Sequence, residues 1–419
     1  MKKFLSLFSR NRKYNNVLEA LYITNLLIKL TGYQVIGLDY SNCDIESEFS
    51  CLGLLFFFLW SILYTYCFYN AQIQGQSVLR LMFNSKLKQY GDIYEVVATA
   101  LYFLYMIRKL CFDLFASPRF ARTIINIDKM VSGIGIHIDY NKDRWLTIGC
   151  VLFVIIICIF RSVSLWFVLN NINVTVPYER AFQSIYSDNL ALVMSIFYWY
   201  HLFLLRERYT LLNKVLIDIK NRSSWEHMIF IRRKPENMNR ASQLQDKYIC
   251  DKIKICAKTC SMLFSASEII NELFGFALYF SLLICMNFII IYMFYFMEAT
   301  ASGLFHDTKI YLDFLVYIFW QIMYSTVILF INVYCAESTV CQVKKMAFIV
   351  HEVINSDLSP AITKEAMLLS QQLLHQYPKF TASGFYTLDY ENLYQKALTI
   401  VTFILMILQF VSDSERKHY

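Results

Sequence analysis

Long apolar runs without a charged residue divide this chain into spans and loops. The runs at 49–79, 273–297 and 314–336 each exceed the roughly 20 residues that an α-helix needs to cross a bilayer. Shorter or interrupted runs also fit a crossing, and they lie at 93–117, 145–171, 189–205 and 397–412. The pattern therefore predicts an all-α membrane protein with seven transmembrane helices.

The N-terminal stretch 17–38 is apolar but contains Glu19 and Lys29. This mixture is amphipathic and typical of a helix that lies in the membrane interface or dips into the bilayer without crossing it. We therefore expect one N-terminal re-entrant or amphipathic segment in addition to the seven spans. The opening residues, MKKFLSLFSRNRKY, have too short an apolar core for a cleavable signal.

Composition supports a membrane location. Of the 419 residues, 57% are hydrophobic and 17% are charged, and the mean hydropathy is +0.42. A soluble protein of this size needs a larger share of polar residues for its surface, so the lipid bilayer is the expected surroundings of much of the chain. The net charge of +7 belongs mostly to the segments expected in the cytoplasm, and no nucleic-acid partner is needed to explain it.

Basic residues in the loops predict the orientation, because Lys and Arg concentrate on the cytoplasmic side. With a cytoplasmic N-terminus, the inner segments hold 27 Lys and Arg and the outer segments hold 7. The C-terminus is then extracellular. The glycosylation acceptor Asn173 lies in an expected outer loop, although Asn221 begins a second acceptor sequence in an inner segment.

Helical patterns continue beyond the spans into the expected cytoplasmic segments. Leu212, Val215 and Ile219 belong to one apolar stripe of helical period, and Ser359 followed by Pro360 suits the start of another helix. The predicted division of the chain is 1–205 for the re-entrant segment and spans one to four, 206–261 for a cytoplasmic helical extension, 262–336 for spans five and six, 337–390 for cytoplasmic anchor helices, and 391–419 for span seven with a short extracellular tail.

Catalytic and metal-binding patterns are missing from the sequence. No two histidines have the H-x-x-x-H spacing, Cys250, Cys256 and Cys260 are not spaced as a zinc pair, and no G-x-S-x-G occurs. The sequence therefore predicts no enzyme, no cofactor and no metal. A G-protein-coupled receptor is disfavoured by the inward N-terminus and by the missing D-R-Y and N-P-x-x-Y patterns, and a secondary transporter by the lack of visible internal repeats.

The last apolar run contains an amide. Met406, Gln409 and Phe410 lie at positions i, i+3 and i+4 of a helix and share one face, which Thr402 extends by one turn. Such a stripe suits a hydrogen bond to a neighbouring helix. It also suits the wall of a shared pore, where amide side chains replace part of an ion's hydration shell.

The same residues resemble a known family. Thr402, Phe403, five apolar residues and then Gln409 and Phe410 are similar to the terminal TYxxxxxQF signature of insect gustatory receptors, with Phe403 in place of the usual Tyr. The segment SGFYTLDYENLYQ at 383–395 resembles the family's region before the last helix, and KLTGYQVIGL resembles its N-terminal region. The resemblance implies a tetrameric ligand-gated cation channel whose last helix lines the pore, with Thr402, Met406, Gln409 and Phe410 at the pore or gate.

The resemblance also implies a ligand pocket in the outer half of the bundle formed by the earlier spans. Arg161 is the main candidate, because a charge within a span needs a partner or a water-filled cavity. Glu95 is a possible partner, and a purely structural ion pair is the alternative. Other candidates combine aromatic faces with hydrogen-bonding groups, as small-molecule sites do, and they are Tyr102, Asn287, Trp320, Gln321 and Tyr324.

We therefore expect a gustatory receptor in the plasma membrane of sensory neurons, assembled as a homo- or heterotetramer with related subunits. Its expected ligands are small-molecule tastants, with bitter or aversive compounds preferred over sugars because no sugar-specific pattern is visible. An insect odorant receptor subunit and a sugar-sensing gustatory receptor are the alternatives within this class. A metabotropic seven-span receptor is the alternative from another class.

Overall fold

The computed structural model describes residues 16–41, 44–73, 87–171, 177–230, 238–301, 308–356 and 358–416. Each predicted span falls in one helix of this part of the chain, except that the first begins with Phe49 and Ser50, which precede α4, and ends with residues 74–79, which lie outside the described part. The elements in chain order are α2 (Val17–Ala20), α3 (Tyr22–Leu30), β1 (Ile36–Ser41), β2 (Asp44–Phe49), α4 (Cys51–Ile73), α6 (Leu87–Gly133), α7 (Tyr140–Asn171), α8 (Tyr178–Phe230), α9 (Met238–Ala301), α10 (Thr308–Ile354), α11 (Pro360–His375), β3 (Thr381–Ala382), β4 (Tyr386–Thr387) and α12 (Tyr390–Arg416).

Four of these helices are long and apolar enough to cross a membrane, namely α4, α7, α9 and α10. Their outward surfaces are hydrophobic. On α7, for example, Phe153, Ile156, Phe160 and Phe167 are each more than 60% exposed, which fits contact with lipid and not with water. The crossings expected of α6, α8 and α12 stay predictions. Charged residues interrupt the apolar run in α6.

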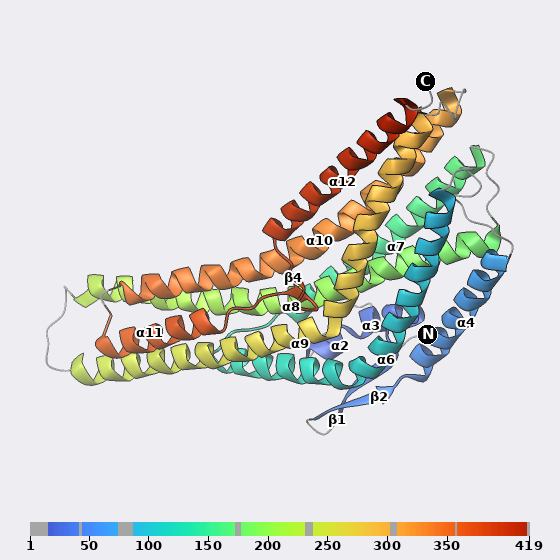
Figure 1. Ribbon diagram of the computed structural model, residues 1–419. Helices are drawn as coiled ribbons and strands as arrows, with labels where there is room; N and C mark the ends of the chain where they lie inside the picture. The colour runs from blue at the N-terminus through green and yellow to red at the C-terminus, as the bar shows by residue number, and fades with distance from the viewer. Residues whose placement is uncertain are drawn as a thin grey trace.

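The helices form two connected parts (Figure 1). At one end α4, α7, α12 and lengths of α6, α8, α9 and α10 form a bundle, and at the other the remaining lengths of α8, α9 and α10 run on with α11 as a flat layer beside the second half of α6. We call this part, made of residues 206–230, 238–261, 337–354 and 360–375, the extended helical layer. The stripe predicted from the sequence is confirmed there, since Leu212, Val215 and Ile219 are buried in the main core.

Helix α11 begins as the sequence predicts, with Ser359 at the N-cap position and Pro360 in the first turn. The Ser359 side chain makes no capping hydrogen bond, however. Its backbone carbonyl instead accepts from the Ile362 and Thr363 N–H groups, at 3.0 and 3.1 Å. Pro360 is therefore the residue that favours the start of a helix here, because its fixed φ suits the first helical turn.

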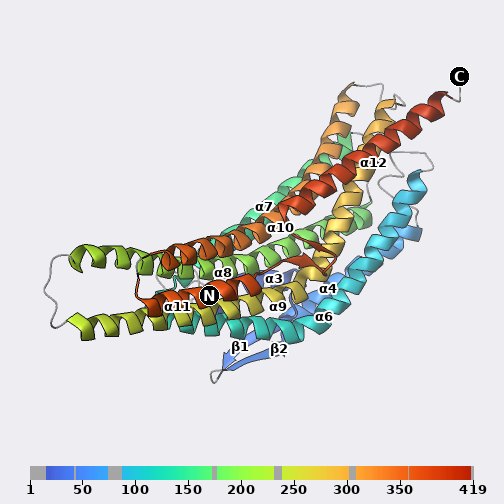
Figure 2. The same cartoon turned by 60° about the vertical axis from the view of Figure 1, so that its left-hand side comes forward.

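Two short antiparallel hairpins interrupt the otherwise helical chain, and neither was predicted. The stretch 17–38 is helical only as far as Leu30, after which Gly32 turns the chain at φ +74° and β1 pairs with β2, Ile36 opposite Phe49. Gly53 lets α4 lie against this segment, because a Cβ there would be 2.5 Å from the Gln34 carbonyl oxygen. Hairpin β3–β4 lies beside α9 at the start of α12 (Figure 2).

Candidate functional site

Arg161 lies between α7 and α10, at the centre of a polar cluster within the bundle. Arg161 as a whole is only 5% exposed. Its Nη2 donates to Gln321 Oε1 at 2.6 Å, and its guanidinium carbon lies 3.9 Å from the centre of the Tyr324 ring. A charge-assisted hydrogen bond and a cation–π contact together offset part of the cost of burying the guanidinium.

Helix geometry explains why these two partners meet one arginine. Gln321 and Tyr324 are three positions apart on α10 and so share a face. The residues directly before Arg161 and Gln321 are also in contact: the Phe160 ring packs edge-on against Trp320, with the ring centres 5.7 Å apart. Four residues predicted as ligand candidates, Arg161, Trp320, Gln321 and Tyr324, thus lie along one α7–α10 contact.

An aromatic cluster adjoins this contact. Its buried residues come from α7, α9 and α10, and Ile322 of α10 packs against it between Gln321 and Tyr324; the members are Val168, Tyr292, Tyr295, Phe314, Tyr317 and Ile318. Asn287 is half-buried on α9, one residue before Phe288, which also packs against this cluster. The site therefore combines one fixed positive charge, an amide and several rings. Such a setting suits a small polar or aromatic ligand.

Two of the predicted ligand residues and the predicted glycosylation site cannot be placed from the described side chains. Glu95 and Tyr102 are in α6, but their side chains are not among the described ones, and Asn173 falls in the undescribed range 172–176. An ion pair between Glu95 and Arg161, a ligand contact at Tyr102 and glycosylation of Asn173 stay predictions.

The pore candidates form a separate group on α12, which runs along the outside of the bundle beside α9 and α10 in both views (Figures 1 and 2). Leu393 and Ile400 pack against the main core. Ile400 is nine residues from Gln409, which corresponds to half a turn about the helix axis. The face with Thr402 and Gln409 therefore points away from its own subunit.

Exposure agrees with this placement. Thr402 and Gln409 are exposed and Met406 is 41% exposed, while the Phe410 side chain lies outside the described ones. The Thr402 hydroxyl donates to the Leu398 carbonyl of its own helix at 2.9 Å. The threonine hydroxyl is thus bonded within α12, and Gln409 contributes an exposed amide to the same face.

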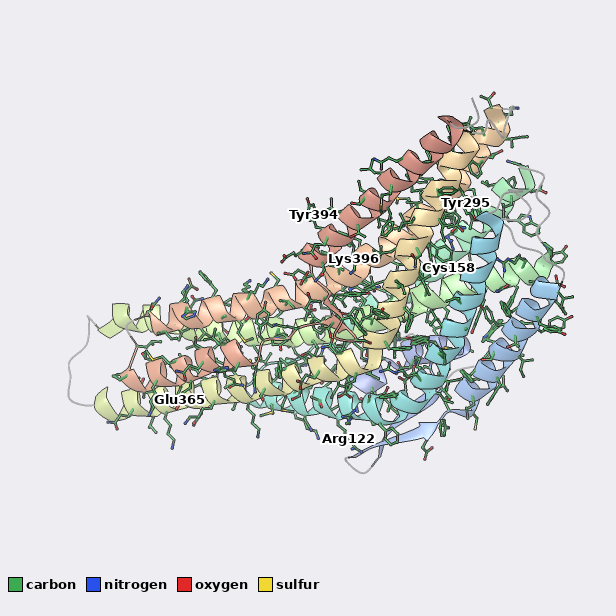
Figure 3. All side chains as sticks on the ribbon, in the orientation of Figure 1. Arg122, Cys158, Tyr295, Glu365, Tyr394 and Lys396 are labelled. Atoms are coloured by element: carbon green, nitrogen blue, oxygen red, sulfur yellow. The ribbon has the colours of Figure 1, made fainter. Side chains whose placement is uncertain are left out.

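Hairpin β3–β4 fixes the base of α12. Asn271 of α9 donates to the Lys379 carbonyl at 2.7 Å and accepts from the Thr381 N–H at 3.0 Å. Lys396 on the second turn of α12 lies 3.5 Å from the centre of the Tyr386 ring, while Tyr394 projects outward and is 71% exposed (Figure 3). The segment that resembles the family region before the last helix is therefore the joint between α9 and α12.

Asp389 caps α12, because its Oδ1 accepts from the Asn392 N–H at 2.8 Å. Burial by itself raises the pKa of this carboxyl, but hydrogen bonds from Thr387 and Asn392 outweigh it, and the pKa lies below its ordinary value. The lowered pKa means that the charged cap is present at neutral pH and lost only as the pH falls through that value.

We expect Asp389→Ala to remove this cap and to cost about 1 kcal/mol of stability. Thermal unfolding of the purified receptor, followed by fluorescence-detected size exclusion, measures the loss. Asp389→Asn is the matched variant, since asparagine caps helices equally well, and it should unfold near the wild-type temperature. Equal destabilisation by both variants would show that the carboxylate charge of Asp389, and not its capping hydrogen bond, stabilises the receptor.

A buried ion cluster that no sequence motif indicates lies around Arg208. Arg208 is 1% exposed and bridges two carboxylates: its Nε and Nη2 donate to Asp128 at 3.0 and 3.1 Å, and its Nη1 donates to Asp143 at 2.9 Å. The Tyr140 hydroxyl donates to Asp128 at 3.1 Å. This cluster joins α6, α7 and α8 where the bundle meets the extended helical layer.

Comparison with known proteins agrees with the fold. Residues 15–413 match the family model of the 7tm chemosensory receptors. The putative gustatory receptor 28a of Drosophila melanogaster is 22% identical over 96% of this chain and 94% of its own length, and the putative gustatory receptor 28b of the same species is 18% identical over 91% and 83%.

Solved structures of the insect olfactory receptor OR5 from Machilis hrabei are also similar to this chain. One covers 93% of this chain and 97% of its own, with 11% identity and a TM-score of 0.53. A second, in complex with eugenol, has a TM-score of 0.46 with 10% identity, over 94% and 98% of the two chains. At 11% identity, the similarity to the structure with the TM-score of 0.53 shows a shared fold alone.

The bundle of long apolar helices defines a multi-pass helical membrane protein. Since the family match extends over nearly the whole chain, the protein belongs to the 7tm chemosensory receptor family. It is a chemosensory receptor and not an enzyme. The resemblance drawn from the terminal motif is confirmed at this level.

Proposed function

We propose that this chain is a gustatory receptor that acts as a ligand-gated, non-selective cation channel. The observation that carries the proposal is the position of Gln409 on the face of α12 opposite Ile400, where it is exposed in the single chain. An amide on an apolar spanning helix is unfavourable in contact with acyl chains. Four copies around a common axis would place it in contact with water and ions instead.

The remaining surface of α12 supports assembly. Large apolar residues are exposed on several sides of the helix, among them Leu398, Val401, Phe403 and Leu405, each 45% exposed or more. Such a surface needs lipid or other protein around it. In the proposed tetramer, related subunits cover part of this surface and the Gln409 face lines the pore. Phe403 has no hydroxyl, so no hydrogen bond from this position takes part.

The proposed ligand is a small tastant, with bitter or aversive compounds favoured over sugars. It binds at the α7–α10 contact around Arg161, where a charge, an amide and aromatic rings lie together. In this proposal the N-terminus is cytoplasmic, the extended helical layer lies in the cytoplasm, and Asn173 is accessible to glycosylation outside the cell. The receptor resides in the plasma membrane of sensory neurons.

Recording current from cells that express the chain, during application of bitter compounds and sugars, tests the channel. Gln409→Glu should raise the calcium-to-sodium permeability ratio about thirtyfold, because four carboxylates about 8 Å from the ion each contribute about 0.5 kcal/mol per unit charge in water, or about 2 kcal/mol together for the second charge of Ca²⁺. Phe403→Leu, about 120° away around α12, is the control and should leave ion preference unchanged.

Two results would contradict the proposal. One is unchanged ion preference in Gln409→Glu together with normal current. The other is a response that starts only after seconds and disappears when G proteins are blocked, which indicates a metabotropic receptor. Activation by volatile odorants, with no response to tastants, would favour an odorant receptor subunit and leave the channel part of the proposal in place.

A further inference from the structure

A cavity of about 420 Å³ lies between α3, α4, α7 and α8. Its volume is within the range of small-molecule sites in proteins, about 300–1,000 Å³. None of the residues of the α7–α10 site around Arg161 lines it. It is therefore a second candidate site, which has α7 in common with the first but is otherwise formed by different helices.

One wall of the cavity consists of three stacked aromatic rings. Trp60 of α4 and Phe182 and Tyr186 of α8 have ring centres 5.6–6.0 Å apart, and the angles between their planes are 10–25°. Trp60 Nε1 donates to the Leu30 carbonyl at the end of α3, at 3.0 Å. This hydrogen bond holds the indole in place and ties α3 to α4, so the wall is formed before any occupant enters.

The lining has the chemistry of a hydrocarbon site. None of its described residues carries a charge, and most are Leu, Ile and Val. The Thr31 hydroxyl already donates to the Ile28 carbonyl at 2.7 Å, which leaves the Asn189 amide as the main polar group. Apolar cavities of this kind remain dry and bind apolar molecules. A charged or strongly hydrogen-bonding ligand would lose its hydration without compensation.

Part of the cavity lining is exposed on the apolar outer surface of the helices. Three lining residues, Leu30, Ile155 and Ile185, are also 38–42% exposed at the surface. Their neighbourhood is apolar: Ile156 on α7 is 64% exposed and Leu59 on α4 is 49% exposed. Since α4 and α7 are both long and apolar enough to cross the membrane, the entrance faces acyl chains.

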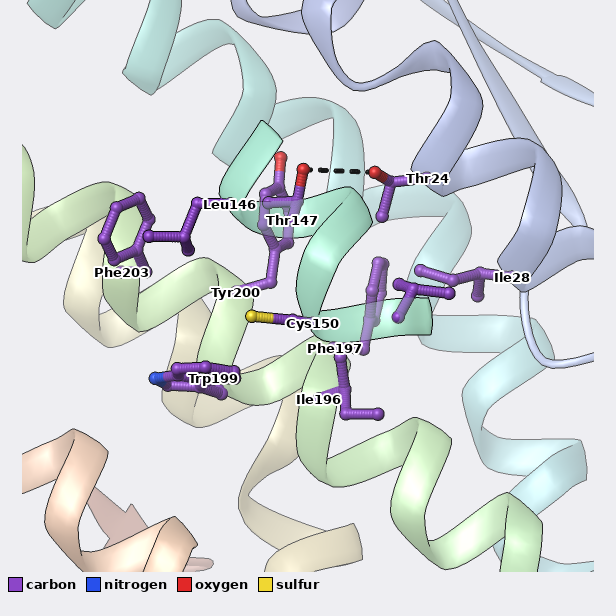
Figure 4. A pocket seen from close by; sticks show the side chains of 11 residues that line it. Thr24, Ile28, Leu146, Thr147, Cys150, Ile196, Phe197, Trp199, Tyr200 and Phe203 are labelled. Atoms are coloured by element: carbon purple, nitrogen blue, oxygen red, sulfur yellow. Dashed lines mark hydrogen bonds between the residues drawn. The ribbon is translucent and has the colours of Figure 1, made fainter. Parts of the chain in front are cut away.

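The inner end of the cavity is closed. A narrow pocket of about 10 Å³ shares Ile28, Val151 and Ile196 with the cavity and continues toward the start of α7 (Figure 4). This volume holds at most about one water molecule. Across the far side of the narrow pocket, Thr24 Oγ1 donates to Thr147 Oγ1 at 3.2 Å. An occupant therefore enters and leaves on the lipid side.

We infer that this cavity holds the hydrocarbon chain of a membrane lipid, packed against the Trp60, Phe182 and Tyr186 rings. The hydrocarbon chain fills space that would otherwise be empty, and it links α3 to helices α4, α7 and α8. The inference does not depend on the channel proposal, because it concerns occupancy of the cavity and not current.

Photolabelling tests it. The full-length receptor is placed in phosphatidylcholine vesicles that contain a phosphatidylcholine with a diazirine on its acyl chain, and labelled peptides are identified by mass spectrometry after illumination. We expect strong labelling of the α4 peptide with Trp60 and the α8 peptide with Phe182 and Tyr186. Val154→Trp, which fills the cavity, should reduce this labelling more than about tenfold, since losing the burial of two methylene groups already has that effect.

Ile156→Trp is the matched control, because it places the same ring two residues away on the exposed face of α7, and its labelling should equal that of the wild type. Size exclusion shows whether each variant is folded, and Val193→Phe on α8 replaces Val154→Trp if that variant is not. Undiminished labelling in a folded cavity-filling variant would overturn the inference. So would wild-type labelling at Trp60 no stronger than at Phe153 on the lipid-facing side of α7.

Discussion

Arg208→Ala should prevent most of the receptor from folding. The variant leaves Asp128 and Asp143 buried without the guanidinium that bonds to both. Removing one partner of a buried ion cluster costs about 3–5 kcal/mol, against a total stability of about 5–15 kcal/mol for a typical domain. The expected result is a large loss of monodisperse protein in fluorescence-detected size exclusion and little receptor at the cell surface.

A nearby exposed pair provides the control. Lys142 of α7 and Glu207 of α8 form an ion pair at 3.1 Å, but the lysine side chain is 58% exposed. Lys142→Ala should change stability by less than about 1 kcal/mol. Combining Arg208→Met with Asp128→Asn and Asp143→Asn should recover much of the lost protein, because no uncompensated charge stays buried. Normal folding of Arg208→Ala would contradict the structural role assigned to the cluster.

Arg161→Met should weaken the response to an activating compound by about tenfold to a hundredfold in half-maximal concentration. A hydrogen bond to a charged group contributes about 1.5–3 kcal/mol, and methionine keeps much of the side-chain volume without the charge. The measurement is a concentration–response curve for the first compound in the bitter and sugar panel that activates the wild type. Arg161→Lys should also be impaired, because an ammonium cannot reproduce the planar stack on Tyr324.

Phe167→Met is the control for this prediction, since Phe167 is on the same helix but 66% exposed toward lipid. It should leave the half-maximal concentration unchanged. A reduced surface level of Arg161→Met with an unchanged half-maximal concentration would show that Arg161 is only a structural partner of Gln321. Gln321→Leu then helps to distinguish ligand contact from a structural role. If both residues contact the ligand at one site, the effects of Gln321→Leu and Arg161→Met on the half-maximal concentration should not be additive.

The helices were predictable because their cause is local. A run of about 20 apolar residues needs satisfied backbone hydrogen bonds in lipid, which a helix provides within itself. The α7–α10 contact was predictable in part for a related reason: Arg161 stands alone in an apolar run, so a partner had to exist. The described side chains show Gln321 and Tyr324 as partners. The side chain of Glu95, the partner suggested by the sequence, is not among those described, so that pairing stays a prediction.

Other features depend on packing between distant segments. Arg208 lies in a segment with many basic residues, and nothing in the local sequence distinguishes it from its exposed neighbours or connects it with Asp128, 80 positions earlier. The strands of hairpin β3–β4 are two residues long, too short for an alternating pattern. In β1, Ile36, Leu38 and Tyr40 do alternate with Gly, Asp and Ser, but the pattern begins inside the apolar stretch 17–38, which favoured a helix. The cavity at Trp60 arises from how four helices meet, so no residue spacing indicates it.

The joint beneath α12 has a consequence for how the family can diverge. A Cβ on Gly275 would lie 3.0 Å from the Ser383 backbone nitrogen. The backbones of α9 and of the hairpin are therefore in direct contact. The spacing between them is therefore set by peptide groups that every amino acid possesses. A residue with a side chain at position 275 would therefore displace the hairpin from α9 and shift the base of the final helix, which makes this glycine the position where divergence would change the tilt of α12.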